Sequence, residues 1–389
     1  MKFCYFLIIM LLSSVVEATN GSDFISHGTK QSGLAGAGAA EAQDSTWMTL
    51  NPATITELPN MFDFHYEYFS PRRVVDMQGF GTNPNRDVDT DESLIPNMSL
   101  TYRLSESEVL GVGLFTYAGA NTHLAQPRSF AGTFGNYDKS VDYWTMKLNV
   151  VYAKKFNNGW SVGFGPSLIF SRLRTDMATL AGTETQGRKE WDDSWGGGFS
   201  FGVHKRWDKW AWGLGYSSKQ WTERFDKYED LFSAIEHPQF VQTGISYKLT
   251  DSLTWLVDYR WIDWNGVNIF KITGTEGGFG WSDQHIVKTG LSWDITGDTT
   301  LRAGYSYGRS AMNADGVFAN ALFPTPIEHH VTFGASHMIT DNFELTLSYI
   351  HGFTKSFTES NKDFAAPVAS GSEVSLDVDL FGIGITWYF

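Results

Sequence analysis

The last nine residues of the chain alternate strictly between two kinds of side chain. Phe381, Ile383, Ile385, Trp387 and Phe389 are large and apolar, whereas the residues between them are two glycines, a threonine and a tyrosine. A period of two predicts a β-strand with one apolar face and one small or polar face. A strand of this kind at the end of a chain is typical of a wall that turns its apolar face to lipid.

The same alternation recurs in fourteen segments from residue 61 onward. We predict strands at 61–70, 96–104, 108–118, 141–156, 159–174, 194–207, 210–218, 239–250, 252–262, 284–295, 298–307, 328–339, 342–351 and 374–389. Short connections rich in Asn, Asp and Gly alternate with long ones, and an even strand number with this asymmetry characterises single-chain bacterial barrels. The sequence therefore predicts an all-β fold, a 14-stranded antiparallel transmembrane β-barrel over residues 60–389.

The two faces of the predicted strands differ in charge. In the segment 252–262, Trp255 and Tyr259 share the apolar face, whereas Asp258 and Arg260 lie on the other face. Lys288 lies on the polar face of the next strand. A charge that faces hydrocarbon is costly, so the charged faces are predicted to line the lumen.

The N-terminus has the pattern of an export signal. Lys2 is followed by an apolar stretch, Phe3 to Val16, and by a small-x-small site that predicts cleavage after Ala18. The stretch is shorter than the roughly 20 residues of a membrane-spanning helix, so we interpret residues 1–18 as a signal peptide that directs the chain to the bacterial outer membrane. Cys4, the only cysteine, lies within it, which excludes thiol chemistry from the mature chain.

Composition and motifs argue against several other functions. The net charge of −14 argues against nucleic acid as a partner. The glycine run at residues 33–38 lacks the Lys-Ser/Thr of a phosphate loop, and His329 and His330 point to opposite faces of a strand. No catalytic triad can be assigned from the sequence. We therefore expect no enzymatic activity, no cofactor and no metal ion.

Residues 19–59 lack the period of two and precede the first strand. The runs 32–38 (SGLAGAG), 42–45 (AQDS) and Asn51-Pro52-Ala53, together with Pro96-Asn-Met98, resemble the FadL/OmpP1/TodX family of outer-membrane transporters of long-chain fatty acids and hydrocarbons. The resemblance covers essentially the whole mature chain. It implies that residues 19–59 form a hatch, a plug of short helices and turns inside the barrel. It also implies that hydrophobic molecules are captured from outside and leave sideways at a kink in the third strand.

The resemblance also implies a contact between the hatch and that kink. Asn51, Pro52 and Ala53 would lie against the third strand, where Gly111 and Gly113 would tolerate the irregular backbone. The alternative is that Asn-Pro forms an ordinary turn and that the glycines merely fit neighbouring backbones.

Four residues are candidate ligand contacts. Arg172 and Phe24 match family positions near the ligand, and Arg260 and Lys288 are inward cations that could meet a fatty carboxylate. Each has an alternative. Arg172 could form a surface pair, Phe24 could be a core residue of the hatch, and Arg260 and Lys288 could pair with Asp258 and Asp294.

The function that these observations predict is a passive outer-membrane channel for hydrophobic compounds, with long-chain fatty acids as the first candidate. Aromatic or alkane hydrocarbons are the alternative substrates, and a surface adhesin or structural barrel is the alternative class. The expected surroundings are outer-membrane lipid and lipopolysaccharide, and we expect a monomer.

Overall fold

The computed structural model describes residues 20–76, 86–87, 92–124, 139–175, 190–229, 233–272, 278–317, 319–321, 323–360 and 371–389. The predicted signal peptide, residues 1–18, lies outside them. No helix in the described ranges has the length and apolar composition needed to cross a membrane.

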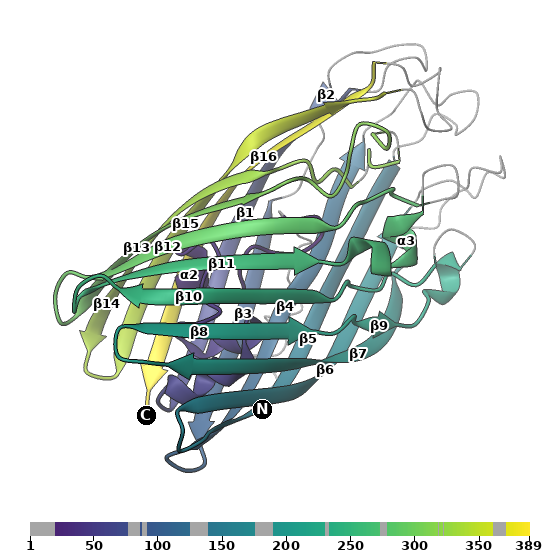
Figure 1. Cartoon of the computed structure of the whole chain (residues 1–389). Coiled ribbons are helices and arrows are strands. Elements are labelled where there is room, and N and C mark those ends of the chain that lie inside the picture. Colours follow the sequence, from purple (N-terminus) through teal and green to yellow (C-terminus); the bar gives the residue numbers. More distant parts are fainter. Residues whose placement is uncertain are drawn as a thin grey trace.

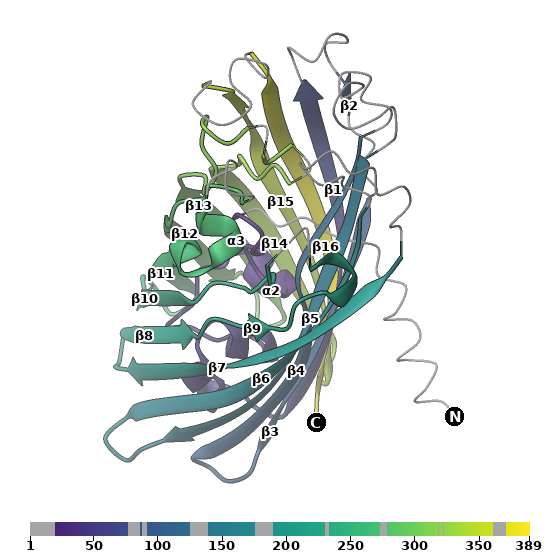
Figure 2. The ribbon, with the colours of Figure 1, turned by 90° about the vertical axis from the view of Figure 1, so that its right-hand side faces the viewer.

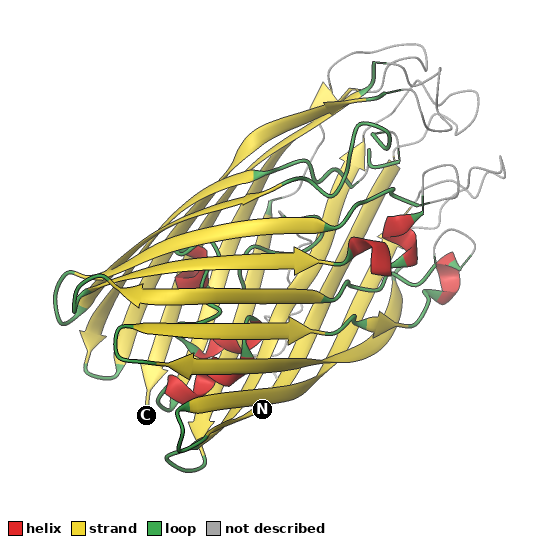
Figure 3. Ribbon diagram, viewed as in Figure 1, coloured by secondary structure: helices red, strands yellow, loops and turns green. Residues whose placement is uncertain are grey.

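Fourteen long antiparallel strands form one closed barrel (Figures 1 and 3). They are β1 (Met61–Asp76), β3 (Ser93–Arg103), β4 (Glu108–Leu124), β5 (Lys139–Lys155), β6 (Trp160–Thr175), β7 (Asp192–Arg206), β8 (Trp210–Ser217), β10 (Phe240–Lys248), β11 (Leu253–Ile262), β12 (Gln284–Asp294), β13 (Thr299–Gly308), β14 (His329–Thr340), β15 (Phe343–Thr358) and β16 (Glu373–Tyr388). Two short strands, β2 (Arg86–Asp87) and β9 (Trp221–Thr222), extend the sheet at β1 and β7. The barrel closes where β16 pairs with β1, from Met61 opposite Tyr388 to Asp76 opposite Glu373.

The structure confirms the predicted architecture and its two faces. Trp255 and Tyr259 are exposed on the outer surface, whereas Asp258, Arg260 and Lys288 are buried inside. Apolar side chains thus face lipid and the alternate side chains face the lumen, because successive residues of a strand point to opposite sides of the sheet.

An N-terminal segment, residues 20–59, lies inside the barrel (Figure 2). It contains α2 (Thr29–Ser32) and two 3-10 helices, η1 (Ser45–Thr49) and η2 (Pro52–Glu57). Apolar side chains of the segment, among them Leu34, Trp47, Met48 and Ile55, are buried. A barrel of this strand number has a lumen wider than its own side chains can fill, and here the segment occupies part of it.

Polar contacts fasten the N-terminal segment to the wall. Lys30 Nζ lies 2.6 Å from Glu344 Oε2 of β15, and Arg206 of β7 lies 2.9 Å from Glu41. The hydroxyl of Ser32 donates a hydrogen bond to Glu67 of β1. Lys30 and Glu344 are buried, so losing one partner of that pair would cost more than losing a surface ion pair, whereas Arg206 and Glu41 are half-buried.

The remaining short helices belong to long connections. They are η4 (Asp226–Tyr228), η5 (Trp264–Gly266) and α3 (Asn268–Lys271). They lie at the end of the barrel opposite the short turns, where α3 and β9 are labelled in Figure 1. In outer-membrane barrels this is the external end.

Candidate functional site

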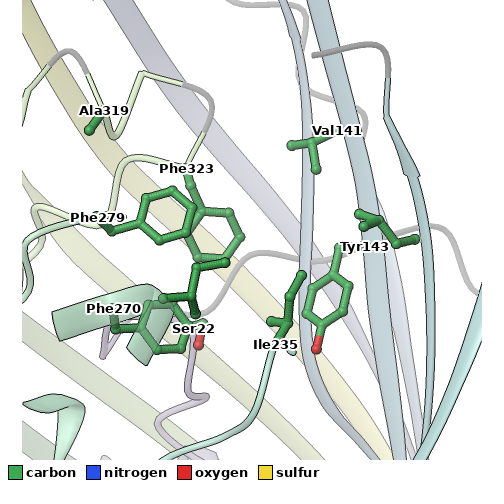
Figure 4. Close-up of a pocket in the computed structure, with 10 residues that line it drawn as sticks. Ser22, Val141, Tyr143, Ile235, Phe270, Phe279, Ala319 and Phe323 are labelled. Atoms are coloured by element: carbon green, nitrogen blue, oxygen red, sulfur yellow. The ribbon is translucent and has the colours of Figure 1, made fainter. Parts of the chain in front are cut away.

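An apolar cavity lies between the N-terminal segment and the long connections (Figure 4). Its free volume is about 40 Å³. The lining residues are Ser22, Val141, Tyr143, Leu173, Ile235, Ile269, Phe270, Phe279, Ala319 and Phe323. Only Ser22 and Tyr143 bring a polar side-chain atom to this lining. The cavity can therefore remove an apolar molecule from water, which is the main requirement of a site for a hydrophobic ligand.

Stacked aromatic rings build the external wall of the cavity. Phe270 of α3 stacks on Trp281 with ring centroids 4.5 Å apart, and Trp281 also meets Trp264 edge to face at 4.8 Å. The indole N–H of Trp281 donates to Asn320 Oδ1 at 2.6 Å. These contacts join two long connections through buried side chains, so the cavity wall is formed before any ligand arrives.

Tyr143, which lines the cavity, also belongs to a polar cluster with His237, Tyr117 and Lys147, which we call the floor. The hydroxyl of Tyr143 lies 3.1 Å from His237 Nε2, and the ring of His237 meets that of Tyr117 at 5.0 Å. Lys147 Nζ lies 4.5 Å from the centroid of Tyr117, and its hydrogen-bond acceptor among the described residues is Ser217 Oγ at 3.4 Å. The Tyr143 hydroxyl thus connects the apolar lining with the polar side chains of this cluster.

The two histidines around this floor are neutral. Burial lowers the pKa of His237 to about 3, and Lys147 nearby acts in the same direction. Burial likewise lowers the pKa of His27 in the N-terminal segment to about 3, with Arg260 and Lys147 adding to the shift. Imidazolium therefore contributes no positive charge to this floor.

Arg260 and Lys288 lie in the lumen, as predicted, but hold the N-terminal segment. Arg260 forms a buried ion pair with Asp23 and covers the ring of Phe240 at 3.9 Å. Lys288 Nζ donates to the carbonyl oxygens of Ile25 at 3.2 Å and Gly36 at 3.4 Å.

The alternative partners of these cations are engaged elsewhere. Asp258 accepts hydrogen bonds from the backbone N–H groups of Gly38 at 2.9 Å and Ala39 at 2.8 Å. Asp294 accepts from the Thr300 hydroxyl at 2.7 Å. Asp258 thus fastens the same segment as Arg260 and Lys288.

The structure places Arg172 outside the lumen, which corrects the ligand contact expected for it. Arg172 shares the outward face of β6 with Phe164 and Leu168, and its Nε lies 2.6 Å from Asp193 Oδ1. Arg172 thus forms a surface pair, as the alternative interpretation expected, and its partner is Asp193. The inward neighbour, Leu173, lines the cavity instead.

Phe24 is buried in a cluster apart from the cavity. It packs with Ile25 of its own segment and with wall residues that include Phe69, Ile350 and Leu380. This is the position of a core residue, the alternative that the sequence left open.

Asn51, Pro52 and Ala53 contact a different part of the wall from the one expected. Asn51 Nδ2 donates to the carbonyl oxygen of Val203 in β7 at 3.0 Å, and Asn51 Oδ1 accepts from Ala53 N at 3.1 Å, which caps η2. A Cβ on Gly202 of β7 would collide with Asn51 Oδ1, and one on Gly163 of β6 would collide with the carbonyl group of Pro52. The motif thus rests on β6 to β8 and not on the third strand.

The third strand, β4, does carry an irregularity. Its register with β5 shifts between Thr116 and Ala118, so that Tyr117 forms a β-bulge. Gly111 and Gly113 lie earlier in the strand, where Gly111 faces Met48 and Ile55 of the N-terminal segment. The glycines therefore permit close packing, and the bulge lies beyond them.

His27 is the residue of the N-terminal segment that meets the bulge. Its ring stacks on that of Tyr117 at 5.8 Å and lies 5.9 Å from Phe115. The sequence did not single out His27, Tyr117 or Lys147. Lys147 could have been found, because it shares the inward face of its strand with Tyr143 and Thr145.

β4 separates from β3 next to this bulge. The two strands pair from Arg103 opposite Val109 to Asn97 opposite Phe115, and no further pair joins them in the described ranges. β3 continues along β1 to Ser93, and β4 continues along β5 to Leu124. Arg73 of β1 reaches across to β4, where it donates to Thr122 Oγ1 at 2.9 Å. The wall thus has a stretch closed by side chains where a ladder of backbone hydrogen bonds would otherwise run.

Comparisons with known proteins agree with this geometry. The family described as outer membrane protein transport protein (OMPP1/FadL/TodX) matches residues 10–389. The long-chain fatty acid transport protein of Escherichia coli is 22% identical over 382 residues, which cover 82% of this chain and 84% of that protein. A 47 kDa outer membrane protein of Pasteurella multocida is 21% identical over 160 residues, so the match spans 39% of this chain and about a third of that relative.

The fold also matches solved structures. The crystal structure of the toluene transporter TodX of Pseudomonas putida superposes with a TM-score of 0.72 at 14% identity, covering 94% of this chain and 99% of that one. At this identity the likeness establishes the fold alone. The family match extends over nearly the whole chain, and the chain therefore belongs to the OMPP1/FadL/TodX family of outer-membrane transport proteins.

Proposed function

We propose that this protein is a passive channel that takes long-chain fatty acids across the outer membrane. The observation that carries the proposal is the apolar cavity whose lining residue Tyr143 joins a polar cluster that contains Lys147. Burying an acyl chain gains roughly 25 cal/mol per Å² of apolar surface, whereas a water-filled pore would offer no such gain. The carboxylate would meet Lys147, which has no carboxylate within ion-pair distance among the described residues.

We further propose that residues 19–59 act as a hatch and that the ligand leaves sideways between β3 and β4. Support comes from the lost pairing beyond Asn97 and from the bulge that points Tyr117 at His27. Because side chains close the wall there, rotamer changes could open it without breaking a strand pair. A lateral exit would let an apolar ligand enter the membrane without returning to water.

Monoaromatic hydrocarbons are the second candidate. Phe270, Phe279 and Phe323 line the cavity, and TodX of similar fold is a toluene transporter. A hydrocarbon needs the apolar cavity but no cationic partner. The two candidates therefore differ in their dependence on Lys147.

The remaining proposals concern export and surroundings. Residues 1–18 would be removed on export, and the mature chain would work as a monomer. Trp255, Leu291 and Trp293 are among the exposed apolar side chains of the outer face that would contact lipid and lipopolysaccharide.

Uptake of labelled oleate and of toluene tests the substrate. Cells that lack their own transporter would carry the wild-type protein, Lys147→Met, or the control Lys205→Met, which removes a lysine from the outer face of β7. We expect Lys147→Met to lower oleate uptake about tenfold, which corresponds to about 1.4 kcal/mol, with toluene uptake unchanged. Toluene uptake without oleate uptake in the wild type would favour the second candidate. If the uptake of neither solute depends on the protein, the transport proposal is wrong and a surface adhesin becomes the favoured function.

A further inference from the structure

We propose that Asp44, Asp63 and His65 form a binding site for a divalent transition-metal ion, with Zn²⁺ as the best-suited probe. One ligand atom from each residue lies within 4.8 Å of the others, and all three side chains are buried. Asp44 belongs to the N-terminal segment, and Asp63 and His65 belong to β1. The ion would tie the segment to the wall beside the seam where β1 meets β16.

Two atoms of this cluster lack any hydrogen-bond partner. Asp44 Oδ2 and His65 Nε2 are both buried and unpartnered in the structure, and they face one another at 3.8 Å. That distance is too long for a hydrogen bond. Leaving two strong polar groups unpaired in a buried site is costly, so their convergence indicates that something binds between them.

The other atoms of the three side chains are held in place. Asp44 Oδ1 accepts from the backbone N–H of Thr46 at 2.9 Å, which caps η1. Asp63 Oδ2 accepts from the backbone N–H and the hydroxyl of Ser45, and Oδ1 accepts from the Thr386 hydroxyl at 2.5 Å, which leaves a lone pair on Oδ1 for a metal. His65 Nδ1 lies 2.9 Å from Thr29 Oγ1 and 3.3 Å from Thr29 N. In the structure the Thr29 backbone N–H donates to Nδ1. Metal binding at Nε2 would require the imidazole proton on Nδ1, where Thr29 Oγ1 could accept it in place of that bond.

The local charge also calls for a cation. Two carboxylates are buried here, and the neighbouring Lys30 is already 2.6 Å from Glu344. No lysine or arginine of the described ranges lies within ion-pair distance of Asp44 or Asp63. A doubly charged ion would neutralise both carboxylates, as a buried charge requires.

The ligand set selects the kind of ion. One imidazole nitrogen and two carboxylate oxygens suit Zn²⁺, whereas Ca²⁺ and Mg²⁺ prefer six or more oxygen ligands. Zinc bonds of about 2.0–2.2 Å separate tetrahedral ligands by about 3.4 Å, so the 3.8 Å between Asp44 and His65 needs only a small closure.

Sequence reasoning predicted no metal ion for this chain. The cluster could not be predicted because Asp44 belongs to an irregular segment. No periodicity in the sequence shows where that segment meets β1.

Metal content and thermal unfolding of the detergent-purified protein test the site. After treatment with EDTA and dialysis against Zn²⁺, we expect about one tightly held zinc ion per chain and a higher melting temperature. His65→Gln should lose both effects. His330→Gln is the matched control, because His330 is also a buried histidine with both ring nitrogens unpartnered. This variant should keep both the bound zinc and the higher melting temperature.

Anomalous scattering at the zinc edge gives an answer even where a variant does not fold. A peak between Asp44, Asp63 and His65 in crystals of the wild-type protein would support the site. Substoichiometric zinc in the wild type, zinc retained by a folded His65→Gln variant, or a peak elsewhere would each overturn it.

Discussion

Gly215 of β8 lies close against the backbone of the N-terminal segment. A Cβ placed on this glycine would collide with the carbonyl group of Leu50, which is backbone and cannot rotate away. We therefore expect Gly215→Ala to lower the free energy of unfolding by about 1–3 kcal/mol, as overpacking does. Thermal unfolding in detergent would measure the change.

Gly297→Ala provides the control at the same scale, because nothing lies within 4 Å of its Cβ position. Its effect should stay within about 0.5 kcal/mol, as for other surface substitutions. Equal stability of Gly215→Ala and Gly297→Ala would show that the segment does not press on β8.

The buried pair of Asp23 and Arg260 makes a second prediction. Arg260→Met should destabilise the protein by about 3–5 kcal/mol, because Asp23 remains buried without its partner. Adding Asp23→Asn to that variant should restore much of the loss, since no buried charge is then left unpaired. Chemical unfolding of the two single variants and the double variant measures the coupling. Additive losses would contradict a direct interaction.

The alternation of apolar and polar residues could predict which face of the wall carries the charged side chains, but not which groups they pair with. Arg260 and Lys288 point inward as predicted, because a period of two separates the two faces of a strand. Their partners, Asp23 and two carbonyl groups, belong to a segment without periodicity. For Arg172 the expected ligand contact rested on the family resemblance alone. The alternation of its own strand places its side chain on the outer face.

At the scale of elements, all fourteen barrel strands were predicted from the sequence, but several of the predicted ranges are shorter than the strands in the structure. β1 runs to Asp76 and β15 to Thr358, six and seven residues beyond the predicted ends at 70 and 351. The extra residues lie at the end with the long connections, where a strand that has left the hydrocarbon no longer needs an apolar face. Hydrogen bonding between strands continues there although the alternation of apolar residues stops.

The bulge in β4 could not be predicted from the alternation of apolar residues. The proposed lateral exit lies next to this bulge. Deleting Tyr117 should restore a regular ladder with β5 and remove the ring that meets His27. We expect at least a tenfold loss of oleate uptake, which corresponds to about 1.4 kcal/mol. The barrel should remain resistant to heat on gels.

Deleting Ile339 is the matched control, because the register of β14 with β15 also shifts between Met338 and Thr340, far from the gap. This deletion should leave uptake close to that of the wild type. If both deletions, or neither, reduce uptake, the bulge at Tyr117 has no special part in release.

At the scale of the whole molecule, two neutral histidines join the N-terminal segment, the bulge and an external connection. The pKa of His27 and of His237 is lowered by burial to about 3, compared with 6.5 in an unfolded chain. Below pH 6.5 the unfolded chain takes up protons that the folded protein cannot. Stability should therefore be complete above pH 6.5 and fall progressively toward pH 3.

Thermal unfolding between pH 7.5 and pH 4 checks this dependence. His237→Gln should reduce the slope, because it removes one of the two groups that resist protonation. A difference in melting temperature between the wild type and His237→Gln that does not change with pH would show that His237 is not held neutral.

The central claim is that the apolar cavity is the path of the transported molecule. Leu173→Trp would fill it from the rigid strand β6, and Leu168→Trp on the outer face of the same strand is the control. The decisive measurement is uptake of labelled oleate and toluene by cells with equal surface levels of each variant. We predict that Leu173→Trp falls to the level of cells without the protein while Leu168→Trp matches the wild type. Unchanged uptake by Leu173→Trp would contradict the account.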